Sequence, residues 1–302
     1  MTRDPYSAHL DFVRPAAAKT EMWRVLVMVA GFEIAFWFAP VLVGGLLPGP
    51  LRATYFEGVS PFATLLQFAT FGVTSILFVR LLHRVHDRGF WSLIGRPDTA
   101  VVDLWRTTWA VGLVLLVVEI LPPWTPLGEV AEVRNLLGWL ALLPFALIVL
   151  VVQVTTEEIY FRGYLQQQLA CRSANPLLWM GLPSLIFGLS HYYNGIGVAD
   201  SLIYVVWATA LGLACADLTA RTGTLGAAIG LHLANNVFAV LLFGVQGWPS
   251  SGLALFLFPD FDPADYDYGV EALFTPGGFL ELLSTVGIVF VLWLAARVAI
   301  RR

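Results

Sequence analysis

Residues 139–166 read WLALLPFALIVLVVQVTTEEIYFRGYLQ, and this stretch decides the fold class of the chain. Its first 18 residues (139–156) carry no charged side chain. A helix needs about 20 mostly apolar residues to cross the hydrocarbon core of a membrane, because each residue advances the helix by about 1.5 Å. We therefore predict a membrane-spanning helix over 139–166.

The composition of the whole chain extends this prediction beyond one segment. Of the 302 residues, 58% are hydrophobic and only 13% are charged, whereas a soluble domain has about 25% charged residues. A soluble globule of this length has too little interior for so much apolar surface, which excludes a soluble enzyme and a disordered protein. The apolar stretches also exceed the roughly ten-residue strands of an outer-membrane barrel. With a net charge of −4 and no long basic block, we expect no nucleic-acid partner.

Eight segments are long and apolar enough to be spanning helices, which predicts an all-α polytopic protein embedded in the lipid bilayer. They lie near 23–46, 62–83, 104–122, 139–166, 177–193, 199–219, 224–244 and 277–298. No internal repeat separates them. We expect a cytoplasmic N-terminal segment at 1–22, followed by a single transmembrane domain over 23–302.

The loops between these segments alternate in charge. Arg and Lys occur before the first segment, after the second, fourth and sixth segments, and at the end of the chain. The loop at about 245–276 has no Lys or Arg and contains Asp260, Asp262, Asp265, Asp267 and Glu271. Because basic loops stay preferentially in the cytoplasm, we expect both termini there and this acidic loop outside. We expect the protein in a bacterial inner membrane.

Ionisable side chains inside predicted spans are the first functional candidates, because charge in the hydrocarbon core is costly. The densest group is Glu157-Glu158-Ile-Tyr-Phe-Arg162. Glu158 and Arg162 are four residues apart, so they share a helix face and can form an ion pair. Glu157 is rotated from them by about 100° and is free to act as a general acid or base. A charge cluster that merely ends the helix at the membrane surface is the structural alternative.

Two histidines in separate apolar segments add to this group. His191 follows Phe187 by four residues, so the ring of Phe187 can pack against the imidazole. Asn236 follows His232 by four residues, and the two can donate hydrogen bonds to one developing oxyanion. Alternatively, Glu157, His191 and His232 can be the three protein ligands of a catalytic zinc ion. A histidine that only bonds a neighbouring helix is the simpler alternative for each imidazole alone.

Other polar residues carry more ordinary expectations. Asp217 and Arg221 are four residues apart and predict a local ion pair. His83 and His86 lie in an Arg-rich stretch that we interpret as a solvated basic loop. Glu33 lies in the middle of the first apolar segment, where it is either protonated or bonded to a neighbouring helix.

In their order along the chain, the three polar motifs resemble the hallmark of the CAAX prenyl endopeptidase and bacteriocin-processing family of intramembrane proteases (CPBP, also called Abi). That hallmark is EExxxR, FxxxH and HxxxN on successive helices. The corresponding residues here are Glu157-Glu158…Arg162, Phe187…His191 and His232…Asn236. The approach to the last motif, RTGTLGAAIGLHLANN over 221–236, is also similar. We expect the family core at about 139–244.

The resemblance implies that the protein is an intramembrane endopeptidase that hydrolyses a peptide bond of a membrane protein or peptide substrate. Glu157 and His191 would activate a water, while His232 and Asn236 would stabilise the oxyanion. The supporting residues would be Glu158, Arg162 and Phe187. With zinc, the ligands would be Glu157, His191 and His232; without a metal, Glu157 is the general base.

Two other functions stay open from the sequence. A non-catalytic membrane scaffold or immunity protein of the same fold could keep these residues for structural reasons. A transporter or channel could use Glu33, Glu157 and Glu158 as a proton relay, and inverted repeats or broken helix pairs would favour it. The sequence shows neither feature.

Pro183 affects the depth of the expected site. If the buried part of 177–193 begins near Pro183, His191 comes level with Glu157. We then expect residues 172–182 at the cytoplasmic surface and a site that opens to the cytoplasm.

Overall fold

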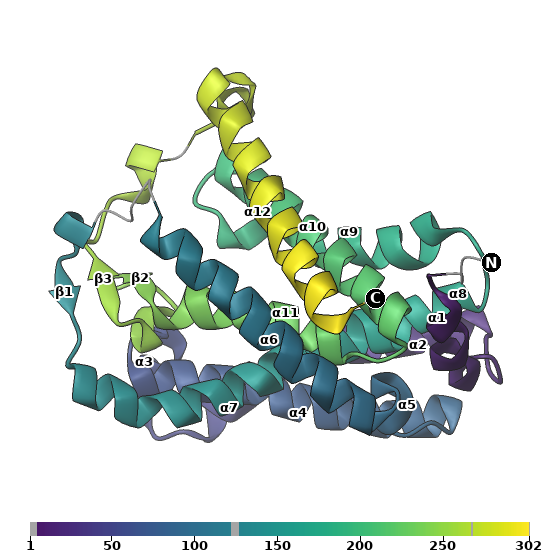
Figure 1. Cartoon of the computed structure of the whole chain (residues 1–302). Helices are drawn as coiled ribbons and strands as arrows, with labels where there is room; N and C mark the ends of the chain where they lie inside the picture. The colour runs from purple at the N-terminus through teal and green to yellow at the C-terminus, as the bar shows by residue number, and fades with distance from the viewer. Residues whose placement is uncertain (1–4, 122–126, 267, 302) are drawn as a thin grey trace.

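The computed structural model describes residues 5–121, 127–266 and 268–301, and long helices dominate it (Figure 1). Within these ranges, six helical segments are long and apolar enough to cross a membrane. They are α2 (Met22–Leu46), α4 (Pro61–His86), α6 (Pro97–Ile120), α7 (Leu136–Tyr160) with its continuation, α10 (Val198–Thr222) and α12 (Pro276–Ile300). The predicted fold class, an all-α polytopic membrane protein, is confirmed.

The quoted stretch forms the longest of these segments. α7 continues through a π-helical turn (Phe161–Gln166) into α8 (Gln167–Ala170), and together they make one helical segment of 35 residues. Such π turns occur often at functional sites, because the extra residue re-aims the side chains around it. Here the π turn contains Arg162, four residues after Glu158.

Two of the eight predicted spans are shorter helices. Over 177–193, a π-helical turn (Leu177–Gly181) leads into α9 (Leu182–Leu189), and Pro183 lies just after the junction of the two. The segment 224–244 forms α11 (Gly226–Leu241), with 16 residues. The end of the predicted segment is instead part of a β-strand. A short apolar run is compatible with either a helix or a strand, so the sequence did not reveal this change.

A small sheet covers one end of the helices. It joins β1 (Glu132–Val133), β3 (Phe256–Phe258) and β2 (Phe243–Val245) in the order β1-β3-β2. β1 is antiparallel to β3, and β2 is parallel to it. The acidic segment at 245–276 therefore begins in this sheet and also contains 3-10 turns (Ser251–Leu253, Pro263–Tyr266 and Val270–Phe274). Asp267 lies outside the described residues, and the external location of this segment stays a prediction.

α11 lies in the middle of the helical bundle and packs against α6, α7 and α10. Its close contact with α6 depends on a glycine, which has no side chain. A Cβ added at Gly230 would lie 2.6 Å from the carbonyl oxygen of Leu104 and 2.9 Å from Cβ of Thr107. In a membrane, where lipid tails are as apolar as leucine, such close backbone approach is a main source of helix association.

Two short helices, α1 (Ser7–Val13) and α5 (Trp91–Ile94), lie at the other end of the molecule, where α1 packs against α8 and α10. A third, α3 (Gly49–Glu57), lies at the end that carries the sheet and packs against α2 and α4. His86 corrects one expectation: it is not in a solvated loop but buried in the last turn of α4, bonded at 2.9 Å to the hydroxyl of Tyr164. Trp179, in the segment predicted to lie at the cytoplasmic surface, is buried against the rings of Tyr6 and His9.

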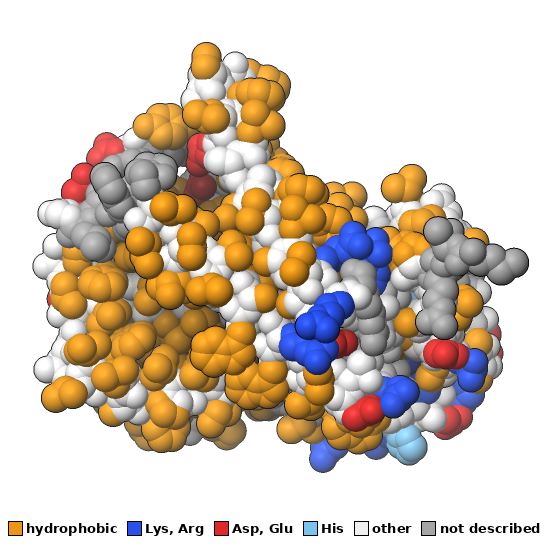
Figure 2. All heavy atoms as spheres, viewed as in Figure 1, with side chains coloured by type: hydrophobic (Ala, Val, Ile, Leu, Met, Phe, Trp, Pro, Cys, Tyr) orange, Lys and Arg blue, Asp and Glu red, His pale blue; other side chains and the backbone are white. Residues whose placement is uncertain are grey.

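The outer surface is largely apolar. Figure 2 shows hydrophobic side chains over most of the face seen, with Lys and Arg gathered towards the end where α1 and α5 lie. Trp37, Phe38 and Leu42 on α2 are each more than half exposed, as expected for helices whose outer face contacts lipid.

Asp217 on α10 connects the N-terminal segment with the last helix. Its carboxylate accepts a hydrogen bond from Tyr6 at 2.7 Å and another from Trp293 at 2.9 Å.

Candidate active site

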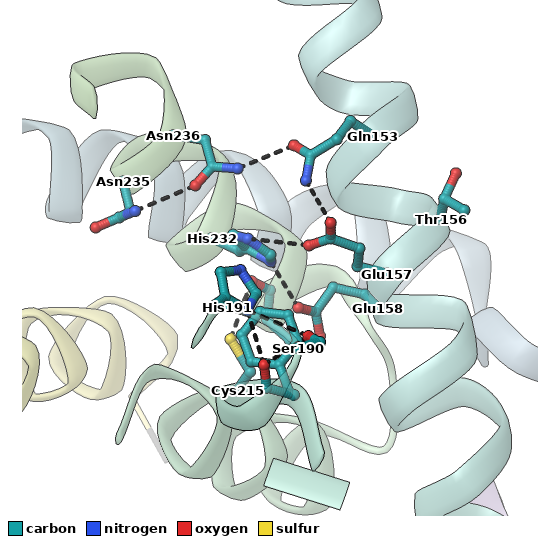
Figure 3. Close-up of polar contacts among 12 residues, drawn as sticks. Gln153, Thr156, Glu157, Glu158, Ser190, His191, Cys215, His232, Asn235 and Asn236 are labelled. Carbon is teal, nitrogen blue, oxygen red and sulfur yellow. Dashed lines mark hydrogen bonds and ion pairs between the residues drawn. The ribbon is translucent and has the colours of Figure 1, made fainter. Parts of the chain in front are cut away.

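The two glutamates of α7 have different environments although they are adjacent. Glu158 is completely buried, and its Oε1 accepts from Arg162 at 3.0 Å, so the predicted ion pair is present. The guanidinium of Arg162 also lies over the ring of Phe187, 4.7 Å from its centre. This pairing offsets part of the cost of burying two charges. Glu157 is 14% exposed at its side chain, and its carboxylate points towards α11 (Figure 3).

His232 on α11 lies between the two carboxylates (Figure 3). Its Nδ1 is 2.8 Å from Oε1 of Glu158, and its Nε2 is 3.5 Å from Oε2 of Glu157. An ionised carboxylate can only accept hydrogen bonds, so Nδ1 carries the proton in its bond to Glu158. That bond holds the ring in one orientation and turns Nε2 towards Glu157.

His191 follows the end of α9, and a backbone carbonyl of that helix orients its ring. Its Nδ1 lies 2.7 Å from the carbonyl oxygen of Phe187, which requires a proton on Nδ1. In the neutral ring, Nε2 then carries the lone pair. The ring of Phe187 contacts both imidazoles, with centroids 4.5 Å from His191 and 5.7 Å from His232. The predicted contact between Phe187 and His191 is present, and the carbonyl of Phe187 adds an orienting bond that residue spacing does not reveal.

Asn236 reaches Glu157 through a residue that our sequence reasoning missed. The amide of Asn236 donates to Oε1 of Gln153 at 2.9 Å, and Nε2 of Gln153 donates to Oε1 of Glu157 at 2.8 Å. Asn235 in turn donates to Oδ1 of Asn236 at 3.1 Å. Gln153 could have been noticed as a polar residue in an apolar helix, four positions before Glu157 and so on the same face.

The structure thus brings the predicted site residues into one cluster on α7, the end of α9 and α11 (Figure 3). Its members are Glu157, Glu158, Arg162, Phe187, His191, His232 and Asn236, joined by Gln153. Glu33 is not among them and lies exposed on α2. Asp217 forms its predicted ion pair with Arg221 at 2.8 Å, at the end of the molecule near α1.

The donor atoms of the cluster do not form the predicted zinc site. In the part of the chain that the structure describes, no three His, Cys, Asp or Glu side chains are arranged to hold a metal ion. Glu157 and His232 face each other, but His191 packs on Phe187 and does not complete a third position. The three side chains as arranged therefore do not fit a zinc ion.

A comparison with protein-family models finds a match over the same region. The family model described as Type II CAAX prenyl endopeptidase Rce1-like matches residues 139–238, which include every member of the cluster. The uncharacterized protein YyaK of Bacillus subtilis (strain 168) is 33% identical over 101 residues. That match covers 32% of this chain and 32% of the relative, so the matched part spans about a third of either protein. No solved structure matches the chain.

Proposed function

Because residues 139–238 are a domain of the Rce1-like type II CAAX prenyl endopeptidase family (CPBP/Abi), we propose that this membrane protein is an intramembrane endopeptidase. Its substrate is a membrane-associated protein or peptide, and a water activated by glutamate and histidine cleaves the peptide bond. Catalysis uses Glu157, His191, His232 and Asn236, and Glu158, Arg162 and Phe187 support them.

The observation that carries this proposal is the pairing of Glu157 with His232. Oε2 of Glu157 is buried and has no hydrogen-bond partner among the described residues, and it faces Nε2 of His232 at 3.5 Å. A buried polar atom without a partner is costly, so each one calls for an explanation. A carboxylate oxygen that is held ready but left free is what a general base requires.

In the proposed first step, Oε2 of Glu157 accepts a proton from a water as the water oxygen attacks the carbonyl carbon. Nε2 of His191 accepts the second hydrogen bond of that water, because Nδ1 is already occupied by the carbonyl of Phe187. One O–H bond of the water breaks, and one C–O bond to the substrate forms.

The negative charge that develops on the substrate oxygen is stabilised by two donors. His232 takes part in its doubly protonated form, with Nδ1 donating to Glu158 and Nε2 donating to the oxyanion. The second N–H of Asn236 is the other donor, since its first N–H is bound to Gln153. In the last step the C–N bond breaks, and Glu157 returns its proton to the leaving amine.

Terminal peptide mass spectrometry of membranes tests this proposal. Cells producing the wild-type protein are compared with cells producing Glu157→Gln at equal abundance. New protein termini should occur only with the wild type, and cleavage by the variant should fall by about 10²–10⁴-fold because the general base is lost. The identified termini also name the substrate.

Glu281→Gln is the matched control, because Glu281 is exposed near the start of α12 and far along the chain from the cluster. This variant should yield the wild-type termini. Identical peptide sets from the wild type and Glu157→Gln would contradict the proposal. They would favour a non-catalytic scaffold or immunity protein of the same fold.

A further inference from the structure

We propose that Gln153 is a positioning residue that orients two parts of the catalytic site through two hydrogen bonds. It orients the water-activating carboxylate of Glu157 and the oxyanion donor Asn236. This inference rests on the proposed endopeptidase function and adds a residue that lies outside the three polar motifs.

Gln153 is placed to join the two helices of the site. It is 5% exposed on α7, one helical turn before Glu157, and its partner Asn236 lies 83 residues further along the chain on α11. Its Nε2 donates to Oε1 of Glu157 at 2.8 Å, and its Oε1 accepts from Nδ2 of Asn236 at 2.9 Å. Gln153 itself is buried and both bonds are partly buried, which strengthens them relative to bonds in water.

The bond to Glu157 selects which carboxylate oxygen is free. Gln153 occupies Oε1 and so fixes the rotation of the carboxylate. Oε2 is then left without a hydrogen-bond partner among the described residues, facing His232. Without this bond, the carboxylate could rotate, and its free oxygen would no longer be held at the position of the attacking water.

The bond to Asn236 selects the orientation of an amide. Oδ1 of Asn236 accepts from Asn235 at 3.1 Å, and its Nδ2 donates to Gln153. The donors all run in one direction, from Asn235 through Asn236 and Gln153 to Glu157. A flipped Asn236 amide would set oxygen against oxygen at Gln153, so the second N–H of Asn236 has one fixed direction.

Only a side chain with a donor and an acceptor can make both bonds. Methionine at 153 has a similar volume but makes neither bond. Glutamate keeps the acceptor for Asn236, but it loses the donor to Glu157 and places a like charge beside it. The chain offers a matched control in Gln67 on α4, whose amide donates to the backbone oxygen of Tyr55 at 2.7 Å, outside the cluster.

The test is a kinetic comparison of purified full-length variants on a peptide that spans the cleavage site found with the wild type. Gln153→Met should lower kcat by about 10–100-fold and leave KM within about twofold, because the reacting groups are misplaced while substrate binding is retained. Gln153→Glu should lose at least as much kcat. Gln67→Met should keep the kcat of the wild type.

A double-mutant cycle separates positioning from simple structural support. If Gln153 acts through Asn236, the effect of Gln153→Met on kcat should shrink in an Asn236→Ala background, whereas unrelated structural effects add. If Gln153→Met fails to accumulate in membranes, the kcat of Gln153→Glu decides the question. Wild-type kcat in the folded Gln153 variants, or full additivity in the cycle, would overturn this inference alone. Equal cleavage by the wild type and Glu157→Gln would instead overturn the proposed function together with it.

Discussion

At the scale of single residues, the site separates two chemically identical side chains by their surroundings. Glu158 is completely buried and holds both Arg162 and His232, so it has a structural task. Glu157 is partly exposed, and its Oε2 faces Nε2 of His232. Residue spacing predicted the Glu158–Arg162 pair, because positions four apart on a helix always share a face. The bond between Glu158 and His232 depends on how two distant helices pack.

This difference predicts a large loss of stability for one of two neighbouring substitutions and a small change for the other. Glu158→Gln leaves the buried guanidinium of Arg162 without its counter-charge, which should lower the free energy of unfolding by about 3–5 kcal/mol. Glu157→Gln should change it by about 1 kcal/mol or less, because the side chain is partly exposed and keeps a bond to Gln153. Thermal unfolding in detergent measures both, and equal melting temperatures for the two variants would contradict the assignment.

At the scale of elements, close approach of α11 to α6 sets the position of His232 and Asn236. Gly230→Ala should push these helices apart, because the new Cβ would lie 2.6 Å from the carbonyl oxygen of Leu104. We expect a loss of about 1–3 kcal/mol in stability, measured by thermal unfolding, together with reduced cleavage. Gly112→Ala on α6 is the control, since an added Cβ there meets no atom within 4 Å. A Gly230→Ala protein as stable as Gly112→Ala would show that this contact is not tight.

The docking of α1 gives a pH-dependent prediction at the same scale. Burial against Trp179 and Phe12 lowers the pKa of His9 to about 4, below its ordinary value of 6.5. Between these two values the undocked helix binds more protons than the docked helix, so docking should weaken as pH falls from about 6.5 to about 4. Above pH 6.5 this contribution is fully present.

Hydrogen exchange of residues 7–13, measured at pH 7 and pH 5, tests this prediction after correction for intrinsic exchange rates. Protection of α1 should decrease at pH 5 in the wild type. His9→Phe, which cannot take up a proton, should show no such decrease. Equal protection of the wild-type helix at both pH values would rule out His9 as the cause.

At the scale of the whole molecule, the two ends of the helical bundle differ in charge. Arg and Lys gather near α1 and α5, while the acidic segment 245–276 includes part of the sheet at the other end. The positive-inside rule then predicts that the end with α1 faces the cytoplasm. This orientation remains a prediction.

Thiol labelling of intact cells would establish the orientation. In a variant lacking Cys171 and Cys215, a membrane-impermeant maleimide should label Tyr268→Cys, because Tyr268 is exposed in the acidic segment. Ser7→Cys, on the exposed side of α1, should be labelled only after the membrane is made permeable. The opposite pattern would mean that the protein is inserted the other way round.

The sequence by itself determined the fold class, the positions of six long helices among the eight predicted spans, and the segments that carry the three polar motifs. These features are local: hydrophobic length decides whether a segment crosses the membrane, and residue spacing decides which side chains share a helix face. The lengths of α9 and α11, the small sheet and the burial of His86 depended on tertiary packing. So did Gln153, whose role requires contact between residues 83 positions apart, and His232, which is 74 positions from Glu158. Contacts between distant helices have no periodic signal in one sequence, and only the folded chain brings those donors and acceptors together.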